Sequence, residues 1–188
     1  MYQRDVKAIR DFIDNDYDKG LERVVTFVIG SIRERFYNIE RVTEDLLLNK
    51  ENSKSAWGNR KKALISFNEL KTTLKHLDNL PLEEATKELT KINGLGVVKA
   101  SFVLQLMGRD TACLDVHNLT RLGISNTYFK GNKRINEYID LVQQKGTEYW
   151  WNTWCELIAD KYPKHFKDAD EVSFIHAKAI TGEYYETM

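Results

Sequence analysis

Apolar residues recur at spacings of three and four along almost the whole chain, which is the pattern of amphipathic helices. The strongest run covers residues 21–32 and predicts a long helix at the centre of a core. Weaker runs predict nine more helices, at about 6–13, 42–47, 55–76, 81–92, 97–107, 115–123, 135–142, 149–162 and 172–180. No segment has the apolar–polar alternation of a convincing strand. We therefore expect an all-α protein.

Proline and glycine mark where some of these helices should begin and end. Pro81 is expected as the first residue of the fifth helix, where its missing N–H costs nothing, and Pro163 stops the ninth. Gly108 is expected to cap the C-terminus of the sixth. Turn signals are scarce elsewhere, whereas a sandwich or barrel needs one roughly every ten residues. The punctuation thus agrees with a helical fold.

A tight turn, Asn93-Gly94-Leu95-Gly96, joins the fifth and sixth helices into a hairpin at about 82–107. Its two glycines allow backbone angles that other residues resist, and they let the main chain approach a ligand closely. Leu95 between them is expected to plug the seam between the two helices. The first N–H groups of the next helix are unpaired and lie at its positive end, so the turn can bind a phosphate without a lysine. The alternative is a plain hairpin whose glycines only make the turn.

The charge balance gives a mixed indication about nucleic acid. The chain has 28 basic and 28 acidic residues, and zero net charge counts against a protein that neutralises phosphates. However, residues 50–76 hold seven basic and two acidic residues, and residues 11–22 hold five acidic ones. A basic face with an acidic back is one interpretation, and an evenly mixed surface is the other.

Cysteine content and hydropathy limit the class of protein. Cys113 and Cys155 are the only cysteines, too few for a four-cysteine zinc or iron–sulfur site, and no cofactor is expected. A disulfide is not required, so a reducing cytosol is the default. The charged start and the lack of a long apolar run predict neither a signal peptide nor a membrane span. We expect a monomer in the cytoplasm, or in the host cytoplasm if the protein is viral.

Residues 92–122 resemble a signature of the DNA glycosylase superfamily that includes endonuclease III, the adenine glycosylase and the oxoguanine glycosylases. That helix-hairpin-helix signature reads Leu-Pro-Gly-Val-Gly-x-Lys-x-Ala, then a helix, a short loop and Val-Asp-x-His. This chain reads Ile-Asn-Gly-Leu-Gly-Val-Val-Lys-Ala at 92–100 and Leu-Asp-Val-His at 114–117. The resemblance implies a two-lobed helical fold as one domain over residues 1–188, with one lobe at about 20–123 and the other made of 1–19 plus 124–188.

The same resemblance implies roles for individual residues on double-stranded DNA. Asp115 would be the catalytic carboxylate, which stabilises an oxocarbenium-like sugar cation and orients or deprotonates a water molecule. Taken alone, an aspartate at a helix start is more simply an N-cap. The residues expected at the DNA backbone are Gly94, Leu95, Gly96, Val98, Lys99, His117 and Arg121.

Two departures from the signature bear on the reaction. The Schiff-base lysine of the family falls on Val98 here, and Lys99 is expected to point elsewhere because one residue along a helix rotates the side chain by about 100°. The resemblance then implies a monofunctional enzyme that uses water. Asn93 replaces the usual proline, which only loosens the turn. No metal is expected on side chains, although a monovalent cation at the hairpin carbonyls is compatible with the resemblance.

The pocket for a flipped base is less clearly marked. Such pockets use aromatic or apolar side chains, and an aromatic beside basic residues suits a nucleic-acid face. The candidates for the pocket are Phe36, Tyr37, Trp57, Tyr128 and Phe129. Trp57 is also a candidate for the DNA face, together with its basic neighbours Arg60, Lys61 and Lys62. Residues 33–38 are where we expect a wedge into the duplex. For two of the three tryptophans at 150, 151 and 154, core packing is the expected role.

Four functions remain open at this stage. The leading one is a monofunctional DNA glycosylase that acts on a flipped nucleotide. A second keeps the scaffold for thymine hypermodification of the phage type, where an amine displaces a pyrophosphate on the base methyl group. A third is a non-catalytic helix-hairpin-helix DNA-binding protein. The fourth, a helical protein with no nucleic-acid role, predicts no salt-dependent DNA affinity.

Overall fold

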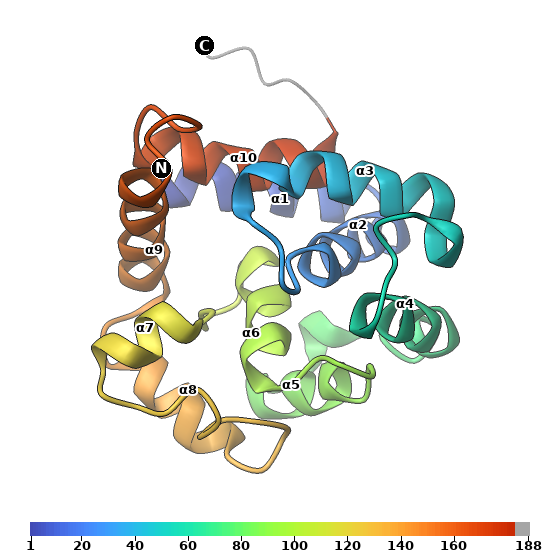
Figure 1. Cartoon of the computed structure of the whole chain (residues 1–188). Helices are drawn as coiled ribbons and strands as arrows, with labels where there is room; N and C mark the ends of the chain where they lie inside the picture. The colour runs from blue at the N-terminus through green and yellow to red at the C-terminus, as the bar shows by residue number, and fades with distance from the viewer. Residues whose placement is uncertain (183–188) are drawn as a thin grey trace.

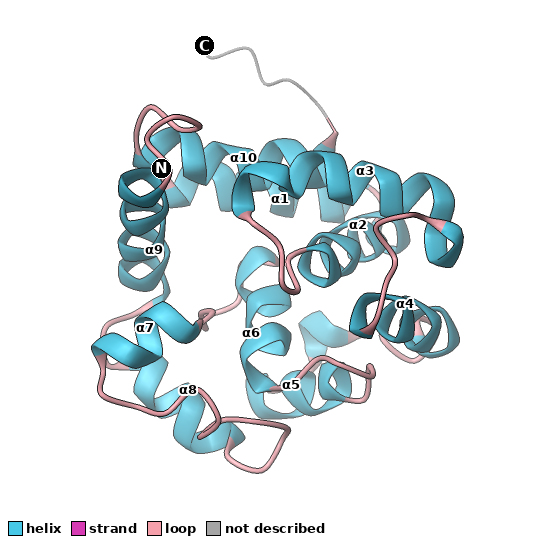
Figure 2. Cartoon of the chain, viewed as in Figure 1, coloured by secondary structure: helices cyan, strands magenta, loops and turns pink. Residues whose placement is uncertain are grey.

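The computed structural model describes residues 1–182, and within them it contains ten α-helices and no strand (Figures 1 and 2). The all-α class is therefore confirmed. Residues 183–188 of the predicted domain lie outside the described residues. The helices are α1 (Tyr2–Asn15), α2 (Tyr17–Gly30), α3 (Ile39–Asn49), α4 (Asn59–Leu70), α5 (Leu82–Thr90), α6 (Val97–Leu106), α7 (Val116–Arg121), α8 (Ile135–Gln143), α9 (Thr147–Lys161) and α10 (Ala169–Thr181).

Each of the ten predicted helices is present, but both ends of the fourth and the start of the fifth need correction. The fourth helix, expected over 55–76, covers only Asn59–Leu70, because the chain continues in turns to a short 3-10 helix, η3 (Leu77–Asn79). Leu74 lies in these turns and Leu77 in η3, and both side chains are buried. The apolar spacing therefore continues past the end of the α-helix. Pro81 is the N-cap of α5 and not its first helical residue.

The predicted end of the sixth helix is confirmed in detail. Gly108 has a φ of +84° and donates its N–H to the carbonyl of Gln105 at 3.0 Å, while Arg109 donates to Leu104 at 2.9 Å. These two bonds form a Schellman motif, and its left-handed residue favours glycine.

The predicted central position of α2 is confirmed by its burial. Its residues 24, 25 and 27–29 are fully buried, and the helix packs against α1, α3, α4, α6 and α10. A second, smaller cluster joins α7, α8 and the beginning of α6 with Trp150. In Figure 1, α6 runs between the two groups of helices. The clusters divide the chain at other points than the predicted lobes, since α1 and α10 share the larger cluster with α2 and α3.

None of the helices within residues 1–182 combines the length and the apolar character that crossing a bilayer requires.

Candidate active site

The turn between α5 and α6 has the shape that its sequence predicts. Gly94 has a φ of +90°, a left-handed backbone angle that favours glycine. The side chain of Leu95 is 2% exposed and belongs to the larger core cluster, so its expected position in the seam is confirmed. Asn93 and Gly94 are exposed, which leaves this part of the turn open to solvent.

Gly96 differs from Gly94 because its backbone angle does not favour glycine and its surroundings are only close. Its φ of −82° is accessible to any residue, but a Cβ at this position would lie 3.4 Å from both the backbone nitrogen and the oxygen of Gly131. The carbonyl of Gly131 also accepts the N–H of Val97, the first residue of α6, at 2.9 Å. The loop around Gly131 therefore covers one side of the hairpin turn, and this N–H is not available to a phosphate.

Asp115 is both the N-cap of α7 and part of a cavity. Its Oδ1 accepts the backbone N–H groups of His117 at 3.1 Å and Asn118 at 3.0 Å. Its Oδ2 accepts the indole N–H of Trp154 on α9 at 2.9 Å. The residue is half-buried. Three donors thus fix the carboxylate in one orientation at the wall of the cavity.

The cavity beside Asp115 is narrow, with a volume of about 60 Å³, and has room for a few water molecules. It is bounded mainly by α6, α9 and the segment before α7. Its lining residues are Lys99, Phe102, Gln105, Cys113, Asp115, Trp150, Trp151, Trp154 and His176.

Lys99 lines this cavity, so the prediction that it points elsewhere is wrong. Its Nζ donates to Ser31 Oγ, 2.9 Å away in the loop after α2. The preceding residue, Val98, packs instead against the smaller apolar cluster of α7 and α8. The helix is therefore rotated about its axis so that position 99, and not 98, faces the cavity.

The rear wall of the cavity is aromatic. His176 on α10 is 1% exposed, and its ring centroid lies 4.3 Å from that of Trp151, 4.9 Å from Phe36 and 5.4 Å from Trp154. Burial lowers the pKa of His176 to about 4, so the ring is neutral at physiological pH. Its Nδ1 faces two backbone carbonyls, which can only accept, so Nδ1 carries the hydrogen and Nε2 is left as an acceptor.

The three tryptophans divide as the sequence predicts. Trp150 and Trp151 are buried, at 5% and 3% exposed, whereas Trp154 is half-buried and binds Asp115. The bond between Trp154 and Asp115 was not predicted. Part of its signal was present, because positions 151 and 154 share one face of a helix.

Cys113 also lines the cavity, and it is held as a neutral thiol. Burial raises its pKa to about 12, and the charge of Asp115 contributes in the same direction, while the nearby ammonium of Lys99 opposes both. The thiolate is the nucleophilic form of cysteine, so this thiol is unreactive at neutral pH.

None of the residues predicted for a pocket or a DNA face lines the Asp115 cavity, but Phe36 packs against Trp154 and His176, which do. Its ring packs edge-on against Trp154, with centroids 4.8 Å apart. Trp57 is 46% exposed and lines a separate hollow of about 500 Å³ with Arg41 and Lys54. The exposed Lys61 and Lys62 lie on α4 outside the Asp115 cavity.

Arg60 needs correction as a residue of the DNA face. Its side chain is 1% exposed, and it donates to the carbonyls of Ile32 and Ser55 and to the carboxylate of Glu34. These bonds use the N–H groups of the guanidinium to fix the loop after α2. The buried side chain is therefore not accessible to a phosphate.

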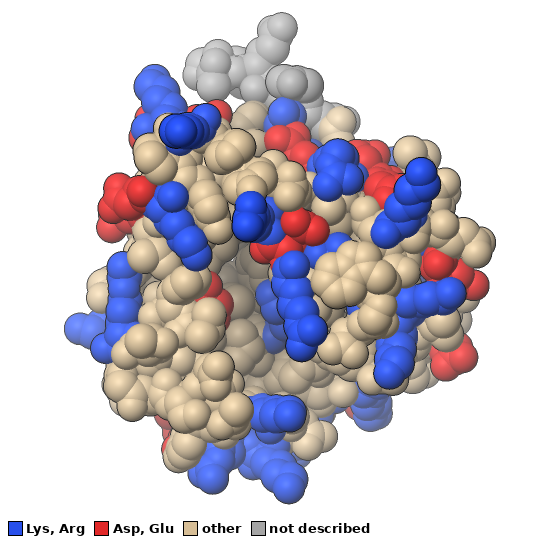
Figure 3. Space-filling view, in the orientation of Figure 1, with Lys and Arg blue, Asp and Glu red and all other residues tan. Residues whose placement is uncertain are grey.

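The remaining predicted contacts flank the site on α7. His117 is half-buried and supplies a backbone donor to Asp115, and Arg121 is exposed in the last turn. Figure 3 shows a hollow in the middle of this face, with basic side chains beside it and below it, and with basic and acidic side chains intermixed above it and to the right.

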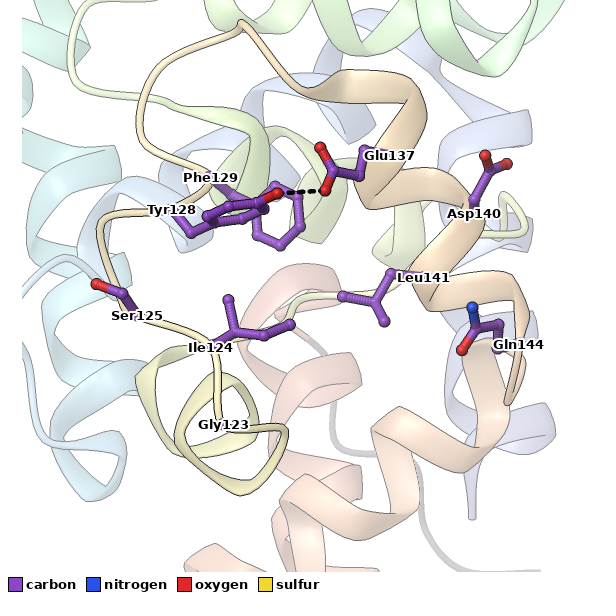
Figure 4. A pocket seen from close by; sticks show the side chains of 9 residues that line it. All are labelled: Gly123, Ile124, Ser125, Tyr128, Phe129, Glu137, Asp140, Leu141 and Gln144. Carbon is purple, nitrogen blue, oxygen red and sulfur yellow. Dashed lines mark hydrogen bonds between the residues drawn. The ribbon is translucent and has the colours of Figure 1, made fainter.

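A third hollow, of about 480 Å³, lies away from Asp115, between α8 and the loop that follows α7 (Figure 4). Ile124, Phe129 and Leu141 give it an apolar wall, and the hydroxyl of Tyr128 bonds the carboxylate of Glu137 at its edge. It shares no residue with the Asp115 cavity, but two of the residues predicted for the base pocket, Tyr128 and Phe129, line it.

No protein-family model matches the chain, and no curated protein and no solved structure is similar enough to be matched. The resemblance over residues 92–122 therefore stays a prediction, and so does every role that it implies.

Proposed function

We propose that the chain is a DNA glycosylase-like enzyme that acts on a nucleotide flipped out of a duplex, with Asp115 at the sugar and water as the nucleophile. The observation that carries the proposal is the position of Asp115. A fixed carboxylate lines a cavity that has room for water and lies beside a helix that begins at an open glycine turn.

The bonds to Asp115 support an electrostatic role. Two backbone N–H groups and one indole N–H hold the carboxylate before any substrate binds. A charge that is oriented in advance stabilises a developing cation without reorganising in the transition state. The sugar cation formed when a glycosidic bond breaks is such a charge, as in other glycoside hydrolysis.

A nucleobase is much larger than the present cavity, so binding requires the cavity to widen. Trp154 is the half-buried member of its wall that also bonds Asp115. Movement of its indole would open the cavity and expose the carboxylate to the sugar in one step. The buried Trp151 and His176 would then remain as the apolar wall against the base.

The DNA backbone would bind at the exposed part of the hairpin turn, around Gly94 and the first turn of α6. The N–H of Val97 is excluded, because Gly131 accepts it, which leaves the donors of Val98 and Lys99. No acceptor is recorded for these two N–H groups within residues 1–182. Donors at the positive end of a helix suit a phosphate.

Lys99 supports a second, bifunctional candidate, because it is the only lysine or arginine that lines the cavity. Its amine could attack C1′ of the sugar in place of water and form a Schiff base. We favour water as the nucleophile, because the Lys99 amine donates a hydrogen bond to Ser31 Oγ at 2.9 Å, which restricts its rotation. Borohydride reduction separates the two, because it traps a covalent protein–DNA adduct only if an amine has attacked.

The test is excision from short labelled duplexes that each carry one modified base, read as alkali-labile sites and as free base. Wild type is expected to release base from at least one duplex, and Asp115→Asn is expected to bind DNA but release none. Base modification without release would favour the hypermodification alternative. Unchanged DNA binding with no product from either protein would leave only a DNA-binding module, and no salt-dependent binding would contradict every nucleic-acid function.

A further inference from the structure

Outside the Asp115 cavity, two aromatic rings from distant parts of the chain stack face to face. Tyr37, in the short 3-10 helix η1 (Phe36–Asn38), and His165, in the loop between α9 and α10, have ring centroids 3.9 Å apart and planes 9° apart. We propose that this pair, with Arg35 and Lys164 beside it, binds an unpaired stretch of a DNA strand. These four residues are called the aromatic platform below.

The platform is held in shape by the protein itself. Arg35 donates to the hydroxyl of Tyr37 at 2.9 Å, and the ring of Tyr162 packs edge-on against Tyr37 at 5.2 Å. Phe166, next to His165, is buried and contacts Phe36, which anchors the loop. His165 itself is exposed. A rigid exposed ring that needs no further ordering is a ready stacking surface for a base.

Basic side chains lie beside the platform. Residues 161–167 contain three lysines and a histidine, and acidic residues flank this segment at positions 160, 168, 170 and 171. Lys161, Lys164 and Lys167 are exposed, as is Arg35, and no carboxylate partner is recorded for their side chains within residues 1–182. By contrast, Lys7 is paired with Asp11 on α1. Free cations beside an exposed ring match phosphates beside a base, the repeating chemistry of a single strand.

The platform lies one aromatic layer outside the candidate active site. Phe36, the neighbour of Tyr37, packs against Trp154, and Trp154 donates to Asp115. A nucleotide that reached Asp115 would bring the adjoining nucleotides of its strand to the platform. This link to catalysis rests on the proposed function, whereas binding of a strand at the platform does not.

The test is fluorescence anisotropy of a labelled oligothymidine, with wild type, three variants of the platform and one control variant over a range of salt. His165→Ala is expected to weaken binding about tenfold, because loss of one base–aromatic stack has effects of this size. His165→Phe keeps a ring and is expected to bind within about twofold of wild type. Lys164→Gln is expected to lower the slope of log affinity against log salt by about 0.7, as for one phosphate contact on a single strand.

Lys7→Gln is the matched control, since Lys7 is an exposed lysine on α1 whose amine is bonded to Asp11. It is expected to leave both affinity and slope unchanged. His165 is exposed, so its substitutions are not expected to unfold the protein, and thermal unfolding of each variant verifies this. Equal affinity of His165→Ala and wild type, or no binding of the strand by wild type, would overturn the platform.

The outcomes also separate this inference from the proposed function. If wild type excises a base and His165→Ala binds oligothymidine as tightly as wild type, the platform is rejected and the proposed glycosylase activity is supported. Loss of strand binding in His165→Ala, with no excision by wild type from any duplex, would support the platform and reject the glycosylase.

Discussion

Helices α6 and α7 both begin at the candidate active site, but they differ in the residue that caps the N-terminus. The N-cap of α6 is Gly96, which has no side chain to accept an N–H, and one donor of this turn is taken by Gly131. The N-cap of α7 is Asp115, whose carboxylate satisfies two donors of its own helix. One helix start thus remains available to an external anion, and the other is closed by an internal one.

Under the proposed function, this difference gives the two starts different tasks. An open start favours an incoming phosphate, through its free donors and its positive end. A closed start fixes a negative charge, which suits a developing cation and repels a phosphate. Four predictions test this division, beginning with the substitution that should change activity most.

The largest effect is expected at the closed start, from the pair Asp115→Asn and Asp115→Ala. Asparagine keeps the N-cap through its one oxygen but lacks the charge, so excision should fall about a thousandfold or more. Its amide NH2 then faces the indole N–H of Trp154, a donor against a donor, so the free energy of unfolding should fall by about 1 kcal/mol. Alanine should lose the same activity and also about 2 kcal/mol of stability, because the cap and the partner of Trp154 are both removed. Excision rates and urea unfolding measure the two effects. An active Asp115→Asn would show that the carboxylate only caps α7.

The next largest effect is a change of stability with pH. His176, in the wall of the cavity beside Asp115, is buried with a pKa of about 4. The unfolded state takes up a proton near pH 6.5 and the folded state only near pH 4, so stability falls as the pH drops through this range. The expected loss is about 3 kcal/mol, at 1.36 kcal/mol for each pKa unit. In urea unfolding from neutral pH to about pH 4, His176→Phe should show a flatter dependence than wild type. Parallel curves would mean that other groups carry the acid sensitivity.

A smaller effect is expected at the open start, where two glycines can be compared. Gly94→Ala places a side chain at a φ of +90° and should cost about 1–2 kcal/mol. Gly96→Ala keeps an ordinary φ, and its Cβ meets Gly131 at 3.4 Å, so it should cost less than about 1 kcal/mol. Urea unfolding of both variants gives the order. A larger cost at Gly96 would mean that the contact with Gly131 is tighter than the strain at Gly94.

The smallest effect is expected at Lys99. This residue lies in the first turn of α6, and its side chain lines the cavity beside Asp115. Lys99→Gln keeps a donor for Ser31 but removes the charge, so the salt slope of duplex binding should fall by about 0.9 and the affinity by less than about tenfold. Lys7→Gln again serves as the control, with no change expected. An unchanged slope in Lys99→Gln would place the ammonium away from the phosphates and favour a role inside the cavity.

Some of the site could be predicted from the sequence because its signals are local. The turn at 93–96 and the cap at Asp115 depend on residues within four positions of one another, and both are present as expected. Arg60 was misjudged, since its burial comes from Glu34 and Ile32, which belong to another part of the chain. A run of basic residues next to a tryptophan does not reveal which of them faces inwards.

The direction of Lys99 could not be predicted for a related reason. Counting residues from Gly96 gives the angle between Val98 and Lys99 around the helix, but not how α6 is rotated against its neighbours. That rotation is set by Val98, which packs into the cluster of α7 and α8 and turns the next position toward Asp115. The angle is a property of the helix, and the rotation is a property of the core.

Local sequence signals are enough to predict the ten helices, the glycine turn that joins α5 to α6, and an aspartate at the start of α7. Periodicity and capping fix these features, because they act between residues a few positions apart. Packing between distant segments decides that Trp154 holds Asp115, that Gly131 covers one side of the turn and that His176 lies behind the cavity. These contacts join residues more than twenty positions apart, and they follow from how the apolar faces of whole helices pack together.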